Sequence, residues 1–361
     1  MRPGQPGVRA ANEAGTAWRR GRQMRRRESG VALIAVLVFV FLAISAVVLF
    51  VQRTSFNTLA IGNQDNAARA EALARGGVRL AQALLIDDRV REQASEFRSD
   101  SLADAWAQAR LVPIPTPDGG SLRLTIEDAG SRLNLNSLFE KGAPKDPASE
   151  QYLIALMEKA IDELPETVEK RLYDPEELAH NLMDYVDADS ELAKGGDEDD
   201  AYLERKPATR AANRPLLSPE ELGAIEGFDA ALVETLRPYI TVFPYAGTNV
   251  GINPNTAPPW VLALLYTGTS GDYHLVEEEE IRRILEAREG GSLLCADEAN
   301  HPSCTPLRSV LPDGVFPPSS YEAEVFFVTA EAQYGSTVRT VSAVVDRSQL
   351  AEPNLLAIRV H

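Results

Sequence analysis

The residues MRRRESG (24–30) and VALIAVLVFVFLAISAVVLFV (31–51) decide the organisation of this chain. The second segment holds 21 consecutive residues, of which only Ser45 is polar. At a rise of about 1.5 Å per residue, a helix of this length spans the roughly 30 Å of hydrocarbon in a bilayer. The sequence therefore predicts one membrane-spanning helix at residues 31–52.

The residues before this helix are typical of a cleaved leader. A secretory signal peptide has a shorter apolar segment, about 7–15 residues, followed by a small-x-small cleavage site. Here Gly30 precedes the apolar residues, an order that resembles a type IV prepilin leader; a simple signal anchor is the alternative. We expect a prepilin peptidase to remove residues 1–30 by cutting between Gly30 and Val31, so that the mature chain keeps its apolar helix.

Charge predicts the orientation of this helix. Residues 1–30 carry eight arginines and two acids, a net charge of +6, and arginines beside a membrane segment stay in the cytoplasm. We therefore expect a single pass through a bacterial inner membrane, with the rest of the chain in the periplasm. We interpret residues 1–23 as an unstructured leader or a misassigned start, because starting at Met24 would give a leader of seven residues.

Composition limits the classes of function. The chain has 361 residues and a net charge of −17, which becomes −23 when the leader is removed. Such an acidic surface disfavours binding to phosphate backbones and permits binding to cations and basic partners. We find no Gly-rich phosphate loop, nucleophile elbow or zinc-protease motif, so the sequence does not predict an enzyme.

The two cysteines, Cys295 and Cys304, stand nine positions apart. In a cytosolic chain they would be free thiols. Outside the inner membrane a disulfide is favoured, and closing a loop of about ten residues would contribute about 2–3 kcal/mol. We therefore expect this disulfide in the periplasmic part.

Periodic and alternating patterns predict an α+β protein. Ala and Leu recur at helical spacing to about Leu85, which predicts one long helix from Val31 with kinks at Gly62 or the Gly76–Gly77 pair. The segment SLADAWAQA (101–109) predicts a short helix with Trp106 in the core. Other segments have patterns typical of β-strands. Leu122, Leu124 and Ile126 alternate with polar residues in a half-buried strand, which ends at a turn at Asp128–Gly130. AEVFFVTAEAQYG (323–335) and STVRTVSAVVDRS (336–348) form a hairpin, and residues 349–361 are an ordered edge or a loose tail.

The middle of the chain is predicted to be helical. Residues 150–164 and 174–188 have amphipathic patterns, and Asn255 or Thr256 is expected to cap a later helix. Residues 218–240 have a Ser218 cap and a turn at Gly227, and resemble a helix-hairpin-helix DNA-binding module. That likeness gives an alternative function, a membrane-anchored DNA-uptake module; the net charge of −23 favours a packing role instead.

One loop is rich in acids around Gly195–Gly196. The acids are Asp184, Asp187, Asp189, Glu191, Asp197, Glu198, Asp199 and Asp200. Calcium takes six to eight oxygen ligands, which carboxylates and carbonyls of such a loop can supply. The loop does not have the EF-hand spacing, and a solvated acidic loop is the alternative.

Seven segments, in this order, resemble one family. They are the Gly30 leader with VALIAVL; DAGSRLNLNSL (128–138); MDYVDADSE with GGDEDDAY (183–202); NRPL through LRPYITVFP (213–244); INPNTAPPWVLALL (252–265); FFVTAEA (326–332); and VRTVSAVVDR (338–347). The order resembles the general secretion pathway protein K family, the large minor pseudopilins of type II secretion. The resemblance runs from Met24 to about Arg347.

The resemblance implies a pilin-like α+β domain, residues 53–139 and 313–361, with a large all-α insertion at 140–312. The insertion would hold two SAM-like or helix-hairpin-helix-like units, at about 145–245 and 250–312. The family implies no catalytic activity and no nucleic acid. It implies assembly with the I-, J- and H-type minor pseudopilins at the tip of the periplasmic pseudopilus, which drives export of folded proteins.

The resemblance also bears on two sites. It implies structural calcium in the inserted domain, for which we expect Asp187, Asp189, Glu198 and Asp200 as ligands. Ala35 occupies the fifth mature position, where most pilin-like subunits carry a Glu that pairs with a neighbour's N-terminal amine; a lone carboxylate in hydrocarbon would be costly. A chain without that Glu suits a subunit with no neighbour above it, and an ordinary membrane anchor is the alternative.

Overall fold

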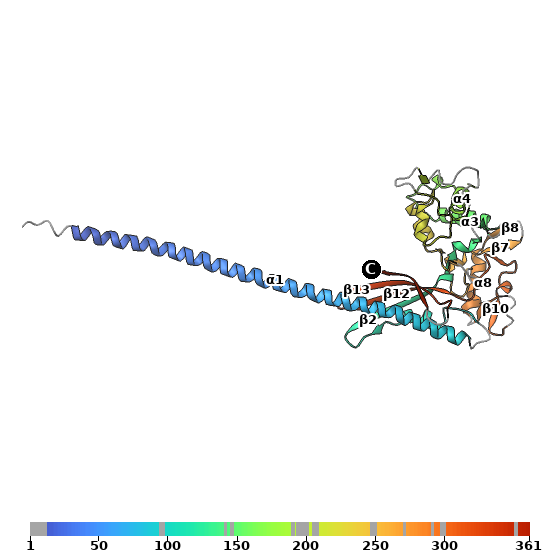
Figure 1. Cartoon of the computed structure of the whole chain (residues 1–361), viewed down its shortest axis with the longest axis horizontal. Helices are drawn as coiled ribbons and strands as arrows, with labels where there is room; N and C mark the ends of the chain where they lie inside the picture. Colours follow the sequence, from blue (N-terminus) through green and yellow to red (C-terminus); the bar gives the residue numbers. More distant parts are fainter. Residues whose placement is uncertain are drawn as a thin grey trace, which may run out of the picture. The chain divides into compact units, whose positions relative to one another are not determined.

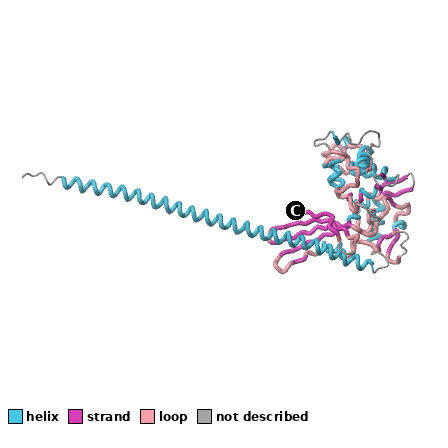
Figure 2. The backbone as a smooth tube through the Cα atoms, viewed as in Figure 1, coloured by secondary structure: helices cyan, strands magenta, loops and turns pink. Residues whose placement is uncertain are grey.

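The computed structural model divides the chain into two compact units, Met1–Asn66 and Ala67–His361. It describes residues 13–93, 98–140, 143–144, 148–188, 192, 202–203, 209–245, 251–269, 272–289, 292–296, 301–349 and 353–361. Figures 1 and 2 show the course of the chain and its secondary structure.

One long helix, α1 (Glu13–Gln93), opens the described chain (Figure 1). The predicted helix is confirmed, and it is longer at both ends than expected. The expectation of an unstructured leader is wrong for residues 13–23, which are helical: this stretch contains no proline, and its alanines and arginines favour helix. The helix is continuous through Gly62 and the Gly76–Gly77 pair.

A five-stranded antiparallel sheet carries the C-terminal part of α1 (Figure 2). Its order is β1 (Ile114–Pro115), β2 (Gly120–Asp128), β12 (Val325–Tyr334), β13 (Thr337–Asp346) and β14 (Asn354–Val360). The predicted half-buried strand is confirmed, since buried and more exposed residues alternate along β2. The predicted hairpin is β12 and β13, paired from Val325–Asp346 to Tyr334–Thr337. The final residues form an edge strand.

Small residues let α1 lie close to this sheet. Ala70, Ala74, Val78, Ala81 and Leu85 recur at helical spacing and are buried in one apolar cluster with residues of β2, β12 and β13. Trp106 of α2 (Ala105–Gln108) belongs to the same cluster, as expected, and its ring meets Phe326 edge-on at a centroid distance of 5.1 Å.

The segment between β2 and β12 forms a second apolar cluster. Its helices are α3 (Ala148–Asp162), α4 (Pro175–Val186), α6 (Ala230–Leu236), α7 (Pro259–Leu262) and α8 (Glu278–Glu289), with 3-10 helices η1 (Ala109–Leu111) before the segment and η2 (Ala129–Ser131), η3 (Leu135–Leu138), η4 (Lys170–Leu172), η5 (Pro219–Ala224) and η6 (Leu307–Ser309) within it. Both expected halves, 145–245 and 250–312, contribute to this one cluster.

The expectation that residues 140–312 are all-α is wrong. Short strands pair within this segment or at its borders: β3 (Leu133–Asn134) with β6 (Ile240–Thr241), β4 (Phe139–Glu140) with β5 (Ala143–Pro144), β7 (Tyr266–Thr269) with β8 (Asp272–Leu275) and β11 (Val315–Phe316), and β9 (Leu293–Cys295) with β10 (Cys304–Pro306). Thr and Tyr favour the strand conformation in β7 and β8. The fold class remains α+β.

Two adjacent glycines of α1 predict opposite effects of the same substitution. A Cβ on Gly77 would lie 2.9 Å from both the Ala330 Cβ and the Leu122 Cδ1, whereas a Cβ on Gly76 would meet nothing within 4 Å. Gly76→Ala should raise the free energy of unfolding by up to about 1 kcal/mol, because Ala favours helix over Gly. Gly77→Ala should lower it, since overpacking costs about 1–3 kcal/mol and exceeds that gain.

Denaturant unfolding of the two variants, followed by circular dichroism, measures both free energies. Equal stabilisation by both substitutions would show that α1 does not pack against β2 and β12 as closely as described.

Candidate functional site

The apolar stretch of α1 is uncovered. Among the described residues, one helix has the length and composition to cross a membrane, and its apolar stretch is not buried by the rest of the chain. Phe39 and Phe50 are 73% and 71% exposed. Gly30 and Val31 lie inside this helix, and Ala35 lies one turn beyond them with its side chain exposed. An uncovered helix of this composition needs lipid or a protein partner around it.

Apolar side chains are also exposed beside β2. Leu73, Gly77, Leu80 and Leu84 recur at spacings of four, three and four, so they share one side of α1. Gly77 places that side over β2, because its Cβ would meet Leu122. Leu80 is 37% exposed there, and Leu111, Val112 and Ile114, beside or on the neighbouring strand β1, are 64%, 70% and 40% exposed. We name these four exposed residues the β1-side strip.

The opposite edge of the sheet is apolar too. All seven residues of β14 are exposed, including Leu355, Leu356, Ile358 and Val360. Ile358 and Val360 pair with Ala343 and Val341, whose side chains are buried. They therefore lie on the same face of the sheet as the core, but remain exposed. An apolar edge strand is a template for association unless something covers it.

A buried charge cluster fixes the end of α1 to this sheet. Arg347, directly after β13, is 2% exposed, and its Nη2 lies 2.5 Å from the Asp100 carboxylate. Its Nη1 donates to Asp88 Oδ2 at 2.7 Å, and Glu92 lies 3.6 Å away. Its Cζ is 4.7 Å from the centre of the Phe326 ring.

The carboxylates of Asp88, Glu92 and Asp100 lie within 4.8 Å of one another, a spacing at which acids can hold a metal ion. Here the Arg347 guanidinium supplies the positive charge, so the cluster is an ion-pair network. Burial raises the pKa of Asp100 well above its usual value, and Arg347 opposes that rise. The surrounding carboxylates outweigh the effect of burial on Arg347 and raise its pKa.

A second buried network joins the inserted segment to the sheet. Asp128, at the end of β2, accepts hydrogen bonds from Gly130 N, Asn253 Nδ2 and Thr256 Oγ1 at 2.6, 3.0 and 2.7 Å. Asn253 Nδ2 also donates to the Asp100 backbone oxygen at 3.2 Å, and its backbone N donates to Gly130 O. Burial raises the pKa of Asp128, and these hydrogen bonds oppose the rise.

Asn255 does not cap a helix, so that expectation is wrong. Pro258 is the N-cap residue of α7. The Asn255 side chain instead donates to Leu294 O and Ser99 Oγ and accepts from Leu294 N. Thr256 likewise donates its hydroxyl to Asp128 and does not cap a helix. Tertiary hydrogen bonds have replaced the local cap at both positions.

The two buried asparagines of the sequence Asn134-Leu135-Asn136 form a third set of hydrogen bonds. Asn134 Nδ2 donates to Pro244 O at 2.8 Å. Asn136 Nδ2 donates to Leu216 O and Val242 O, each at 2.9 Å, and Asn136 Oδ1 accepts from Leu216 N. The motifs that carry the resemblance therefore hold the inserted segment together from within.

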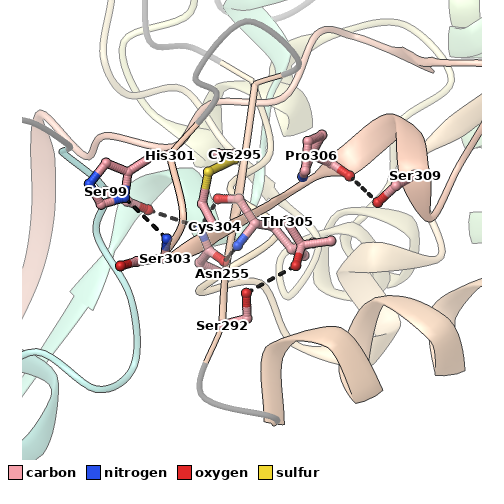
Figure 3. Close-up of a disulfide and its surroundings, with 11 residues drawn as sticks. Ser99, Asn255, Ser292, Cys295, His301, Ser303, Cys304, Thr305, Pro306 and Ser309 are labelled. Carbon is pink, nitrogen blue, oxygen red and sulfur yellow. Dashed lines mark hydrogen bonds between the residues drawn. A yellow bond between two sulfur atoms is a disulfide. The ribbon is translucent and has the colours of Figure 1, made fainter.

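The structure joins the two cysteines, as Figure 3 shows. Cys295 lies on β9 and Cys304 on β10, two strands paired in parallel, and their Cα atoms are 5.9 Å apart. The hydroxyl of Ser292, directly before β9, lies 3.0 Å from the hydroxyl of Thr305 on β10. Since Asn255 binds Leu294, this disulfide-closed segment is tied to the second network.

Most of the expected calcium ligands lie outside the described residues. These are Asp189, Glu198 and Asp200. Asp187 is the residue at the C-cap of α4, and Asp184, one turn earlier, is buried. The described part of this loop therefore places two of its acids together at the end of one helix.

The helix-hairpin-helix-like run is packed into the core. Leu222, Ile225, Phe228, Leu232 and Leu236 are all buried. Gly227 adopts a φ of +82°, and a Cβ there would lie 2.9 Å from Leu178 Cδ2 on α4. The turn lies against a neighbouring helix, as a packing role predicts. The start of the run is the 3-10 helix η5, and the Ser218 side chain makes no cap hydrogen bond.

Sequence reasoning missed the residues that build the buried networks. Asp128, Asn253 and Arg347 lay inside quoted motifs, but Asp128 follows Glu127 and Arg347 stands between two polar residues, so the local sequence did not mark them as buried. Asp100 stands in a polar stretch, RSDS, that gives no sign of its burial.

Comparison with known proteins gives a consistent result. Residues 131–245 match the family described as type II secretion system (T2SS), protein K. The type II secretion system protein K of Pseudomonas aeruginosa is 32% identical over 251 residues, which cover 67% of this chain and 69% of that protein. The protein K of Klebsiella pneumoniae is 29% identical over 266 residues, covering 73% and 76%.

A solved structure has a similar fold. It is a chain of the GspK-GspI-GspJ complex from the type 2 secretion system of enterotoxigenic Escherichia coli, with a TM-score of 0.57 and 21% identity. The match covers 84% of this chain and 99% of that one. The sequence matches show the family, and the structural match shows the fold: this chain belongs to the type II secretion system protein K family.

Proposed function

We propose that this chain is a minor pseudopilin, held in the inner membrane by residues 31–52 with its remaining domains in the periplasm. One observation carries the proposal: α1 continues from an uncovered apolar stretch into a half that packs on an antiparallel sheet. The uncovered apolar part of α1 is suited to contact with lipid and with partner helices, and the C-terminal part of α1 belongs to the core of the folded domain. Residues 53–139 with 313–361 form the pilin-like domain in this account, and residues 140–312 form the insertion with its two SAM-like units.

The two apolar edges of the sheet support assembly with partners. The β1-side strip and β14 flank the same sheet, and each exposes apolar side chains at 37% or more. The related complex contains GspK with GspI and GspJ. We propose that an I-type and a J-type subunit cover these two edges, and that an H-type subunit joins the chain to the pseudopilus.

A position at the pseudopilus tip follows from two features. Ala35 has no carboxylate to neutralise a neighbour's N-terminal amine. The Asp128 network ties the insertion to the sheet, and the Asn134 and Asn136 hydrogen bonds hold the insertion together from within, so it cannot swing aside. Repeated along a thin filament, that bulk would collide with its neighbours, whereas at the end of the filament it has room.

Assembly can be tested with purified I- and J-type partners. The full chain in detergent should form a complex of one copy of each protein, measured by light scattering. Leu80→Glu and Ile358→Lys place a charge on one edge each, and each should weaken binding of one partner at least tenfold. Leu172→Glu is the matched control, because Leu172 is 78% exposed and lies in the insertion. Filaments of this chain alone, or equal loss in the control, would contradict the proposal.

Leader removal is the second test. We propose that a prepilin peptidase cuts between Gly30 and Val31, because a small residue there leaves room for the enzyme at the backbone. Gly30→Leu should leave the full-length chain in the membrane, whereas the parent should begin at Val31. Intact-mass measurement of chain recovered from membranes with the peptidase present distinguishes the two. A Gly30→Leu chain that still begins at Val31 would rule out this processing.

Calcium binding is a further proposal about the acidic loop. Its donor groups are all oxygens, which suit calcium, and Asp184 and Asp187 stand together at the end of α4. Asp187, Asp189, Glu198 and Asp200 would hold the ion, whose charge would offset the repulsion among these carboxylates. Binding to the native state alone stabilises by about 2.7 kcal/mol at a hundredfold excess over Kd.

Thermal unfolding with calcium and with a chelator tests this proposal. Calcium should raise the Tm of the full chain, and the double variant Asp189→Asn/Asp200→Asn should abolish the increase. The control variant Glu177→Gln removes an acid from the first turn of α4, at the far end from the loop, and should keep the calcium-dependent increase in Tm. Equal Tm values with calcium and chelator in the parent chain would leave a solvated acidic loop.

A further inference from the structure

A groove of about 590 Å³ separates α3 from the β7–β8 hairpin. These elements lie beside one another in Figure 1. One wall is a single face of α3, formed by Gln151, Ala155, Glu158 and Asp162 at spacings of four, three and four. The other wall carries Tyr266 and Tyr273. We name these six residues the α3 groove; its volume lies within the range typical of ligand sites.

The aromatic wall of the α3 groove is held in place. The rings of Tyr266 and Tyr273 stack, with centroids 5.4 Å apart and an interplanar angle of 17°. Behind them, the centroid of the Tyr152 ring lies 5.5 Å from that of Tyr266, and the Tyr152 hydroxyl donates a hydrogen bond to Leu264 O at 2.7 Å. Tyr152 is fully buried, so it cannot move away. The groove therefore offers a preformed aromatic surface, in which Tyr273 is the more exposed ring because Tyr266 is only 6% exposed.

The opposite wall carries unpaired negative charge. Among the described residues, the carboxylates of Glu158 and Asp162 have no hydrogen bond or ion pair. Lys159 and His274 also line the groove. Lys159 is paired with Glu163 at 2.8 Å, and Lys170, outside the lining, donates to the Asp162 backbone oxygen. Glu158 acts on the aromatic wall as well, since burial and then this carboxylate raise the pKa of Tyr266.

The same molecule shows what such a pair of walls binds. Arg347 lies between Asp100 and the Phe326 ring, and Arg132 lies 5.0 Å from the Phe327 ring while pairing with Glu127 at 3.0 Å. Each arrangement places a cation between a carboxylate and an aromatic face. The α3 groove has the carboxylates and the rings, and its own chain supplies no cation between them in the described residues.

We propose that the α3 groove binds an arginine carried by an extended peptide segment of a second protein. A guanidinium is planar, so it can stack on a tyrosine ring while its N–H groups donate to a carboxylate. The net charge of −2 from Glu158 and Asp162 complements that cation. The site lies in the insertion, away from both sheet edges, and it does not depend on the pseudopilin assembly proposed above.

Fluorescence anisotropy can test this with the full chain in detergent at 0.1 M salt. The probe is a labelled peptide, Gly-Ser-Arg-Ser-Gly, and its partner carries neutral citrulline in place of the arginine. We expect the arginine peptide to bind at least tenfold more tightly than the citrulline peptide. The double variant Glu158→Gln/Asp162→Asn should lose that preference, and so should Tyr273→Leu.

A matched control separates the site from the general acidity of the chain. Glu177→Gln/Glu289→Gln removes the same charge from exposed acids outside the groove and should leave the affinity unchanged. The Tm of each variant, compared with that of the parent, shows that it is folded. Equal binding of the citrulline peptide, equal weakening in the control, displacement by spermidine at the same concentration as by the arginine peptide, or no binding at millimolar peptide would each overturn the proposal.

Discussion

The structure depends on a guanidinium that is almost entirely removed from water. Arg347 and Asp100 are 247 positions apart in the sequence and meet with the Asp88 carboxylate of α1 beside them. An uncompensated charge in such a place would be strongly destabilising, and removal of one partner of a buried pair typically costs about 3–5 kcal/mol. The pair therefore forms only if the end of α1, the loop after it and the end of β13 all reach their native positions together.

The insertion is attached through the same region. Asp100 accepts from Ala323 N with its carboxylate and from Asn253 with its backbone oxygen, and Asn253 also reaches Asp128 at the end of β2. The loop after α1, the segment before α7 and both ends of the inserted segment thus share one set of buried polar groups. A domain joined by a flexible linker could move aside to make room for neighbouring subunits of a filament. This insertion is fixed, which supports the proposed position at the tip of the pseudopilus.

Much of this fold was predictable because its signals are local. The apolar residues 31–51, the alternation along β2 and the hairpin of β12 and β13 are each encoded by neighbouring residues in the sequence. The networks were not predictable, since Asn255 has the side chain of a helix cap and only the tertiary structure shows that it binds Leu294 instead. The strands β7 and β8 were missed for a similar reason: four residues each, they are too short to establish a period against helical neighbours. The carboxylates of α3 gave no sign of a site in the sequence, because only the tertiary structure places two tyrosines opposite them.

Native-state hydrogen exchange tests most directly whether the buried networks make the sheet and the insertion one cooperative unit. The amides of Asn253, Ala323 and Leu294 donate within or beside these networks, and Val328 lies at the centre of the sheet. If the networks hold the two parts together, all four amides should exchange with the same free energy of opening, equal to that of global unfolding. Exchange of Asn253 and Leu294 at a clearly lower free energy, with Val328 still protected, would show that the insertion opens by itself and would contradict this account.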